Sequence, residues 1–322
     1  MGPTSWTPRP KTSRTASSRG GGALLAALGI AALLLILLPD PAYAWGPATH
    51  VYLGQTLLHN LHLVPEAVRV LLAAHPWDFL YGSLAADISL AKKYVPEGRH
   101  CHHWHIGEEI HASAPSDRLR AVGLGYLSHL AADTIAHNWY VPRQLLLTSS
   151  TKGLGHSYWE VRMDKHVGER YIRLARSVVM DHDHTAADTL FDQVLSATLF
   201  SFRTNRRIFR GLIRFQDNDR WQNVFGTLIT NSRWELAPET VQGYVERSFD
   251  YVVDYLNHRG EAIAAGLDPI GDRNLALSKQ VRRMALRDGA WDRPELLREM
   301  ADEFFPLPEV PFGYLEQVVP AG

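Results

Sequence analysis

The sequence predicts an all-α fold. Apolar residues recur three and four positions apart through most of the chain after residue 44, which is the spacing of one face of a helix. No segment alternates apolar and polar residues as a half-buried strand does, and we find no glycine-rich nucleotide-binding loop or internal repeat. Residues typical of helix boundaries flank the periodic segments: Pro65 stands at the start of one, and Ser116 and Pro142 bracket the longest.

Each periodic segment has its own boundary signals. The first is capped by Thr49. The helix at 117–137 is entered at Ser116 and closed before Pro142, and 156–179 has one continuous apolar face. The segments expected to be helical are 49–60, 65–74, 104–111, 117–137, 156–179, 185–214, 238–258 and 273–286, followed by an extended tail at 306–311. Residues 78–93 are expected to form a helix or a helix followed by a turn.

Composition excludes some classes of protein. The 322 residues include 33 Lys and Arg against 34 Asp and Glu, so a formal charge of −1 gives no reason to expect a surface that coats nucleic acid. A hydrophobic content of 46% is enough for a real core. Cys101 is the single cysteine, so no disulfide can form within the chain and stability must come from packing or metals. We interpret Cys101 as a small buried apolar residue, with metal ligation as the alternative.

Residues 1–44 are expected to be a targeting segment. A basic leader precedes an almost unbroken apolar run at 23–38, and Ala42 and Ala44 match the A-x-A pattern that signal peptidase accepts. We therefore expect a cleaved secretory signal, a mature chain that begins at Trp45, and a secreted or periplasmic protein. The alternative is an uncleaved membrane anchor formed by residues 23–38. The basic residues of the leader are Arg9, Lys11, Arg14 and Arg19.

The sequence H-L-A-A-D-T-I-A-H places His129, Asp133 and His137 at successive steps of four. Each step of four on an α-helix turns the side chain by only about 40°, so the three polar groups share one stripe of a helix that otherwise looks buried. Buried ionisable groups cost several kcal/mol unless they are paired or coordinated. His and Asp are ordinary zinc ligands. A metal site and a hydrogen-bonded core both fit this triplet.

Further polar residues surround this stripe in the sequence. Ten of the 16 histidines lie between His75 and His166. Downstream, His156 and Glu160 again place two ligand types on one helical face, although such a pair is often a surface hydrogen bond. Upstream, Asp87 stands in an apolar context, where a helix cap is the alternative. The segment R-H-C-H-H-W-H, which also fits a nonspecific metal tract, supplies His100, His102, His103 and His105.

The order of these residues resembles the zinc-dependent phospholipase C family. It is more distantly similar to the trinuclear-zinc single-strand nucleases and to the amino-terminal domain of glycosylphosphatidylinositol-specific phospholipase D. The resemblance covers about 45–180, which implies a zinc-binding catalytic core there and a helical region at 181–322 that packs on the core or extends it. The matched residues are Trp45, His50, Asp87, His102, His129, Asp133, His137, His156 and Glu160.

The resemblance implies about three zinc ions held between helices. The first would be bound by Asp87, His102, His129 and Asp133. The second would be bound by His137, His156 and Glu160. The third would be bound by the free amine and carbonyl of Trp45, with His50 and Asp133, so that Asp133 bridges two ions. The choice of His102 over His103 rests on the H-x-W pattern that ends at Trp104.

The function expected from this resemblance is an exported zinc-dependent phosphodiesterase, first of all a phospholipase C that cleaves a phospholipid head-group phosphodiester by a metal-bound hydroxide. Asp87 and Asp133 would be the catalytic carboxylates. The alternatives are a single-strand nuclease, which the neutral charge disfavours, and a non-catalytic zinc-stabilised module that binds through residues 184–322. The expected partners are a phospholipid or other phosphodiester substrate and a membrane surface, and no protein partner is evident. No choline pocket can be matched, so the head group stays open.

Overall fold

Helices follow one another throughout the part of the chain that the structure describes. The structure is a computed structural model that describes residues 45–90, 92–148, 154–232, 234–289, 293–309 and 312–318. No strand occurs in these ranges, which confirms the predicted fold class. They all lie within one compact unit of the chain, residues 39–322. The signal segment predicted at 1–44 lies outside the described residues.

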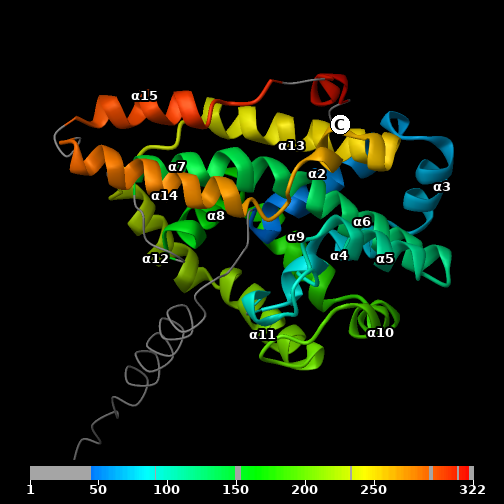
Figure 1. The fold of residues 1–322 in the computed structure, drawn as a ribbon. Coiled ribbons are helices and arrows are strands. Elements are labelled where there is room, and N and C mark those ends of the chain that lie inside the picture. The colour runs from blue at the N-terminus through cyan, green and yellow to red at the C-terminus, as the bar shows by residue number, and fades with distance from the viewer. Residues whose placement is uncertain are drawn as a thin grey trace, which may run out of the picture. The chain divides into compact units, whose positions relative to one another are not determined.

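The α-helices are labelled in Figure 1 and have boundaries close to those predicted for several segments. None of the described helices is both long and apolar enough to cross a membrane. In chain order they are α2 (Pro47–His59), α3 (Glu66–Ala74), α4 (Pro76–Ala85), α5 (Trp104–Ala112), α6 (Asp117–Ile135), α7 (Val141–Thr148), α8 (Leu154–Val167), α9 (Glu169–Met180), α10 (Thr185–Val194), α11 (Phe202–Gln216), α12 (Asp219–Thr230), α13 (Pro238–His258), α14 (Asp272–Arg287) and α15 (Pro294–Phe304).

Helix α6 lies in the middle of the helical packing. It begins at the predicted cap, where the Ser116 side chain accepts a hydrogen bond from the backbone N–H of Leu119, and most of its residues are buried. Helices α4, α5 and α13 pack around it (Figure 1). The crossing with α4 is very close, because a Cβ atom at Gly82 would lie 2.0 Å from the carbonyl oxygen of Val122. This crossing brings the end of α4, and Asp87 just after it, beside α6.

The end of α6 differs from the prediction. The helical run does not close before Pro142 but continues through a π-helical turn, η4 (Ala136–Tyr140), into α7. Because a π turn is wider than an α turn, His137 no longer follows the simple α-helical stripe that the sequence predicted. Such turns occur frequently at functional sites. Pro142 is then the second residue of α7, directly after the π turn.

Three other predictions were wrong in detail. The single helix predicted at 156–179 is broken into α8 and α9 at Gly168, whose φ of 113° is a conformation that favours glycine. Thr49 is not the cap of α2, which begins at Pro47 after the N-cap residue Gly46. The region predicted as 185–214 forms α10 and α11, and helices α12 and α15 have no predicted counterpart.

The C-terminal helices divide between two interiors. Helix α13 packs against α6 and contributes to the main core, whereas α14 and α15 pack on α7. This second contact is an apolar cluster of its own, made by Leu146, Val281, Ala285, Leu297, Ala301 and Phe305. The domain boundary expected near residue 180 stays a prediction.

Candidate metal centre

Asp133 lies at the centre of a buried polar cluster. Its Oδ1 is 3.3 Å from Nε2 of His50, and its Oδ2 is 3.1 Å from Nε2 of both His102 and His129. All four side chains are almost completely buried. The two carboxylate oxygens therefore face different histidines, which is the arrangement that a bridge between two ions needs.

The short distances around Asp133 are not ordinary hydrogen bonds. Within the described part of the chain, neither Asp133 oxygen has a hydrogen-bond partner in acceptable geometry, and the same is true of Nε2 of His50. Buried polar atoms without partners are rare because each costs about 1–3 kcal/mol. Burial by itself would raise the pKa of Asp133, but the imidazoles of His129, His102 and His50 hold it well below its usual value. The cluster is therefore an ionised carboxylate on which three imidazoles converge, and the Nε2 atoms of His102 and His129 also lie within hydrogen-bond distance of each other, at 3.1 Å.

The orientation of two rings fits metal ligands. The Nδ1 atom of His129 is 2.9 Å from the carbonyl oxygen of Ser83, and Nδ1 of His137 is 2.5 Å from that of Pro269. When Nδ1 donates its hydrogen to a carbonyl oxygen, Nε2 keeps a lone pair that can bind a metal. This hydrogen bond from the other ring nitrogen is usual for a histidine that binds metal. Nε2 of His137 is buried and has no hydrogen-bond partner among the described residues. These donors, their burial and their unsatisfied atoms fit zinc.

Asp87 joins the cluster from the short 3₁₀ turn η2 (Ala86–Ile88). One ligand atom each from His50, Asp87 and His129 lie within 4.8 Å of one another, as do those of His102, His129 and Asp133. Asp87 Oδ1 is 3.5 Å from Nε2 of His102. The structure thus brings together all four residues of the first predicted ligand set.

Lys92, which the sequence analysis did not select, also lies in this cluster. Its Nζ atom is 2.9 Å from Asp87 Oδ1, and it is 3.4 Å from both ring nitrogens of His102, so it stands over the face of that ring. The side chain is 2% exposed. Burial alone would lower the pKa of Lys92, but the neighbouring Asp87 and Cys101 raise it overall, so the ammonium stays charged. A lysine in a K-K-Y segment gives no sequence signal for such a position.

The histidine-rich segment contributes His102 rather than His103. The His102 ring is fully buried beside Asp133, whereas His103 is half-buried and stacks on His105 with ring centroids 5.3 Å apart. Cys101 is buried, and its thiol is 3.4 Å from the carbonyl oxygen of Ala86. Burial raises the pKa of this thiol to about 11, so it stays protonated, in keeping with its interpretation as a packed apolar residue.

The second predicted ligand set lies next to the first. Nε2 of His156 is 3.1 Å from Glu160 Oε1, and the His156 ring centroid is 5.4 Å from that of His137. The His137 ring is in turn 6.4 Å from that of His102. Burial, together with the Asp87 and Asp133 carboxylates, raises the pKa of Glu160 well above its usual value. A cation at this position would offset that rise, because it would compensate the carboxylate charge.

Trp45 and the start of α2 are held in place by buried contacts. The Trp45 indole is fully buried, donates a hydrogen bond of 3.0 Å to the carbonyl oxygen of Ala132, and lies 4.9 Å from the Tyr140 ring. Asp164 accepts hydrogen bonds from the backbone N–H groups of Ala48 at 3.1 Å and Thr49 at 2.9 Å.

Asp164 therefore caps α2 from α8, four residues after Glu160. A Cβ atom at Gly46 would lie 2.2 Å from the Asp164 carboxylate, so any other residue there would displace the capping group. Burial raises the pKa of Asp164 to about 6. The sequence analysis missed this residue, because nothing in the sequence pairs it with a helix more than 100 residues away. Its spacing of four from Glu160 was the one available signal.

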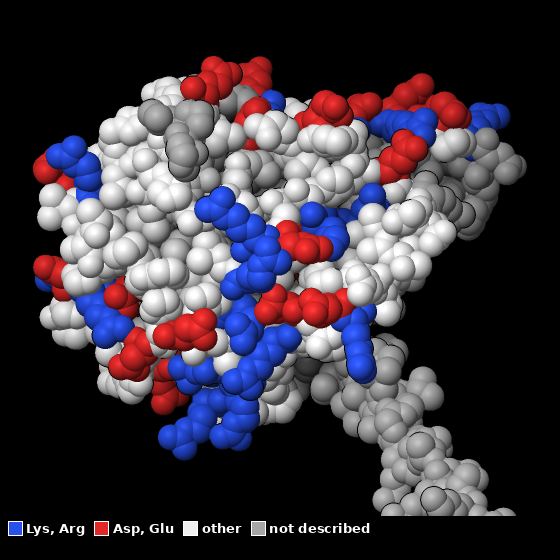
Figure 2. All heavy atoms as spheres, turned by 180° about the vertical axis from the view of Figure 1, so that it is seen from behind, with Lys and Arg blue, Asp and Glu red and all other residues white. Residues whose placement is uncertain are grey.

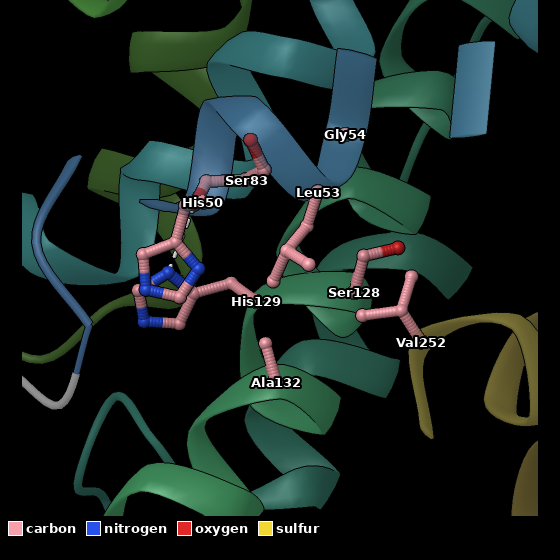
Figure 3. Close-up of a pocket in the computed structure, with 8 residues that line it drawn as sticks. All are labelled: His50, Leu53, Gly54, Ser83, Ser128, His129, Ala132 and Val252. Atoms are coloured by element: carbon pink, nitrogen blue, oxygen red, sulfur yellow. Dashed lines mark hydrogen bonds between the residues drawn. The ribbon is translucent and has the colours of Figure 1, made fainter. Parts of the chain in front are cut away.

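A small cavity lies beside the stacked rings of His50 and His129, whose centroids are 3.9 Å apart. Figure 3 shows the two rings facing each other, with Leu53 and Ala132 nearest to them and Val252 farther away beside Ser128, all of which line the cavity. The volume of about 10 Å³ suits one water molecule. The cavity is too small for a phospholipid head group, so its apolar wall serves to hold the two rings against the cluster.

Comparison with known proteins agrees with this geometry. Residues 49–204 match the model of the zinc-dependent phospholipase C family. The matched segment is similar to that family over just under half of the chain. The match confirms the family that the order of histidines and acids suggested, and it supports a zinc-dependent phosphodiesterase in general terms. No curated protein and no solved structure gave a match.

The matched segment covers every predicted ligand except Trp45, which precedes it. It begins in the first turn of α2 and ends within the first turn of α11. Most of α11 and helices α12–α15 therefore lie beyond the matched segment.

Proposed function

We propose that this chain is an exported zinc-dependent phospholipase C that hydrolyses the head-group phosphodiester of a phospholipid. The observation that carries the proposal is the convergence of three imidazoles on the two oxygens of Asp133, with no hydrogen bond to either oxygen among the described residues. An interior built this way is costly without a cation and favourable with one.

The proposed zinc ligands are the nine residues selected from the sequence, Trp45, His50, Asp87, His102, His129, Asp133, His137, His156 and Glu160. Bound zinc supplies a Lewis acid that polarises a phosphoryl oxygen and lowers the pKa of water. Asp133 presents one oxygen to His50 and the other to His102 and His129, and so would join two ion positions. Lys92 holds Asp87 in place through its contact with Oδ1. We propose that Asp87 orients the attacking water and accepts its proton.

The amine of Trp45 is the proposed ligand that needs export. An indole has no lone pair for zinc, so the contribution of Trp45 must come from a free amine, with a usual pKa of about 8, and from its carbonyl. Cleavage after Ala44 would create that amine. The buried indole and the Asp164 cap fix the position of this residue beside Ala132, one residue from Asp133.

Two forms of the protein test the amine, one beginning at Trp45 and one with an added alanine before it. We expect the extended form to lose one zinc and most of its activity while it keeps the other ions. Equal zinc content and equal turnover in the two forms would remove Trp45 from the site.

A hydrolysis screen of the mature protein with measured zinc content tests the function. We expect release of phosphorylated head groups from phospholipids and little hydrolysis of single-stranded nucleic acid. Glu160→Gln should abolish this activity with nearly native helix content, because α8 keeps its packing. The matched control Glu169→Gln, on the exposed first turn of α9, should keep the activity. Nuclease activity without lipid hydrolysis would overturn the proposed substrate.

A further inference from the structure

Helix α11 carries five arginines and no acidic residue, in a chain whose overall charge is close to zero. Arg206 is compensated, since its Nε is 2.5 Å from Asp188 Oδ2. The other four follow one another at spacings of four, three and four. On an α-helix these positions fall within about 60° of one another. We call them the arginine face: Arg203, Arg207, Arg210 and Arg214.

The arginine face is largely accessible, and the Asp188 carboxylate that interacts with Arg210 is already paired with Arg206. Arg203, Arg207 and Arg214 are exposed and Arg210 is half-buried, while the opposite side of α11 packs inward through Phe202, Phe209 and Ile213 among others. No ion pair joins any of the four to another residue in the described ranges of the chain. Lys and Arg side chains gather low on the molecule in Figure 2, in the part where Figure 1 places α11.

Such an arrangement is unfavourable for an isolated helix. Like charges three or four residues apart on one helical face repel each other and destabilise the helix by about 0.2–0.5 kcal/mol per pair. The arginine face has three such neighbouring pairs. An external anionic partner would attract these arginines and compensate their mutual repulsion.

The position of α11 links the arginine face to the metal centre. Helix α11 packs against η2, the turn that carries Asp87, and against α9. Three of the four arginines of the face lie beyond the segment that matches the phospholipase family, and Arg203 lies at its end. A partner bound at α11 would therefore lie close to the turn that supplies Asp87.

We propose that the arginine face docks this protein on the surface of a membrane that contains anionic phospholipids. A bilayer with anionic lipids attracts basic segments by about 1 kcal/mol per Lys or Arg near the surface. Leu199, which lies beside the first turn of α11, is 57% exposed and offers an apolar contact as well. The arginine face has no aromatic residue on which a nucleic-acid base could stack, which disfavours single-stranded nucleic acid as the partner.

Sedimentation with vesicles tests this proposal on the full mature protein with its zinc. Vesicles of phosphatidylcholine alone are compared with vesicles that also contain phosphatidylglycerol, over a short incubation at low and at high salt. We expect binding only to the mixed vesicles, and weaker binding at high salt because screening shortens the reach of the charges. Equal binding to both kinds of vesicle, or binding that salt does not change, would overturn the proposal.

Substitutions assign the binding to α11. The variant with all four arginines of the face changed to Gln should bind mixed vesicles roughly 1,000-fold more weakly, since each lost charge contributes about 1 kcal/mol. Changing the same four to Lys keeps the charge and should keep most of the binding. The matched control changes four exposed arginines on and beside α14 and α15 to Gln, with the same loss of charge: Arg283, Arg287, Arg293 and Arg298. Equal weakening in this control would contradict a specific face.

The inference rests on the proposed function only for the choice of a lipid partner, and two readouts separate them. Hydrolysis of a short-chain, water-soluble phospholipid should be the same in the wild type and in the Gln variant. A protein that docks through α11 but hydrolyses no lipid would keep the docking proposal and end the proposed function. If the protein hydrolyses the soluble lipid and the Gln variant binds vesicles as the wild type does, the proposed function is kept and the docking proposal is overturned. Binding of single-stranded DNA that depends on α11, without vesicle binding, would overturn the docking proposal.

Discussion

The helical run from α6 to α7 supports two interiors of opposite chemistry. Around α6, Asp133 and its imidazoles form a buried charged cluster that is packed by α2, α4 and α13. Around α7, Leu146 meets α14 and α15 in an apolar cluster that includes Leu297 and Phe305. Because the two interiors are built on consecutive stretches of the same helical run, comparing them indicates which one is stable without a bound partner.

The two interiors have different requirements. Each apolar side chain buried in the second cluster contributes about 1.5–3 kcal/mol without any further partner. Each buried charge around Asp133 costs several kcal/mol unless another charge or a cation compensates it. The first interior should therefore depend on metal, and the second should not.

Metal removal should cause the largest change in stability, and it should act on the interior around α6. At a free zinc concentration 1,000-fold above Kd, each bound ion stabilises the folded state by about 4 kcal/mol. We expect a strong chelator to lower the melting temperature by on the order of 10 °C, and added zinc to restore it. The measurement is thermal unfolding followed by circular dichroism. An unchanged melting curve in chelator would contradict a metal-dependent interior.

Leu297→Ala probes the apolar interior. Leu297 is buried in the cluster between α7, α14 and α15, so its truncation leaves a cavity and should lower the free energy of unfolding by about 3 kcal/mol. Because no proposed ligand lies in this cluster, zinc content and the response to chelator should stay as in the wild type. Urea unfolding with and without chelator checks both. Loss of zinc in this variant would show that the two interiors are not independent.

A smaller effect is expected from His184, which is outside both interiors. The ring stacks on Tyr81 with centroids 3.6 Å apart, and Nε2 donates to the carbonyl oxygen of Val178 at 2.6 Å. Burial lowers the pKa of His184 to about 4. Between pH 6.5 and 4 the unfolded chain thus holds a proton that the folded chain lacks, so stability falls as the pH falls.

His184→Phe keeps the stacking and removes this titration. Between pH 7 and pH 4 the free energy of unfolding should fall in both proteins. The fall should be about 2 kcal/mol smaller in His184→Phe than in the wild type. Urea unfolding at several pH values measures this difference. Parallel curves for the two proteins would show that His184 does not contribute.

Local signals in the sequence predicted the helices and the polar stripe. The Ser116 cap and the apolar periodicity of α5 and α13 depend on residues close in sequence, and each agrees with the structure. The stripe of His129 and Asp133 was visible because both lie on one continuous α-helix.

Features that depend on contacts between distant segments could not be predicted. The π turn at His137 has no signal in the local sequence, whereas the break at Gly168 had a local signal in the glycine itself that the apolar periodicity outweighed. Lys92 reaches the cluster through a short turn after α4, and Asp164 acts on α2 across more than 100 residues of chain. Both are ordinary charged residues in the sequence, and only their burial beside particular partners gives them a role.

Zinc content of the Asp133→Asn variant tests the central claim most directly. The matched control is Asp250→Asn, since Asp250 is equally buried but accepts hydrogen bonds from the backbone N–H groups of Phe312, Gly313 and Tyr314. If Asp133 bridges two ions, Asp133→Asn should lose more than one zinc per chain, whereas Asp250→Asn should keep the wild-type content. A loss of one ion or none from Asp133→Asn would contradict the bridge and the shared centre built on it.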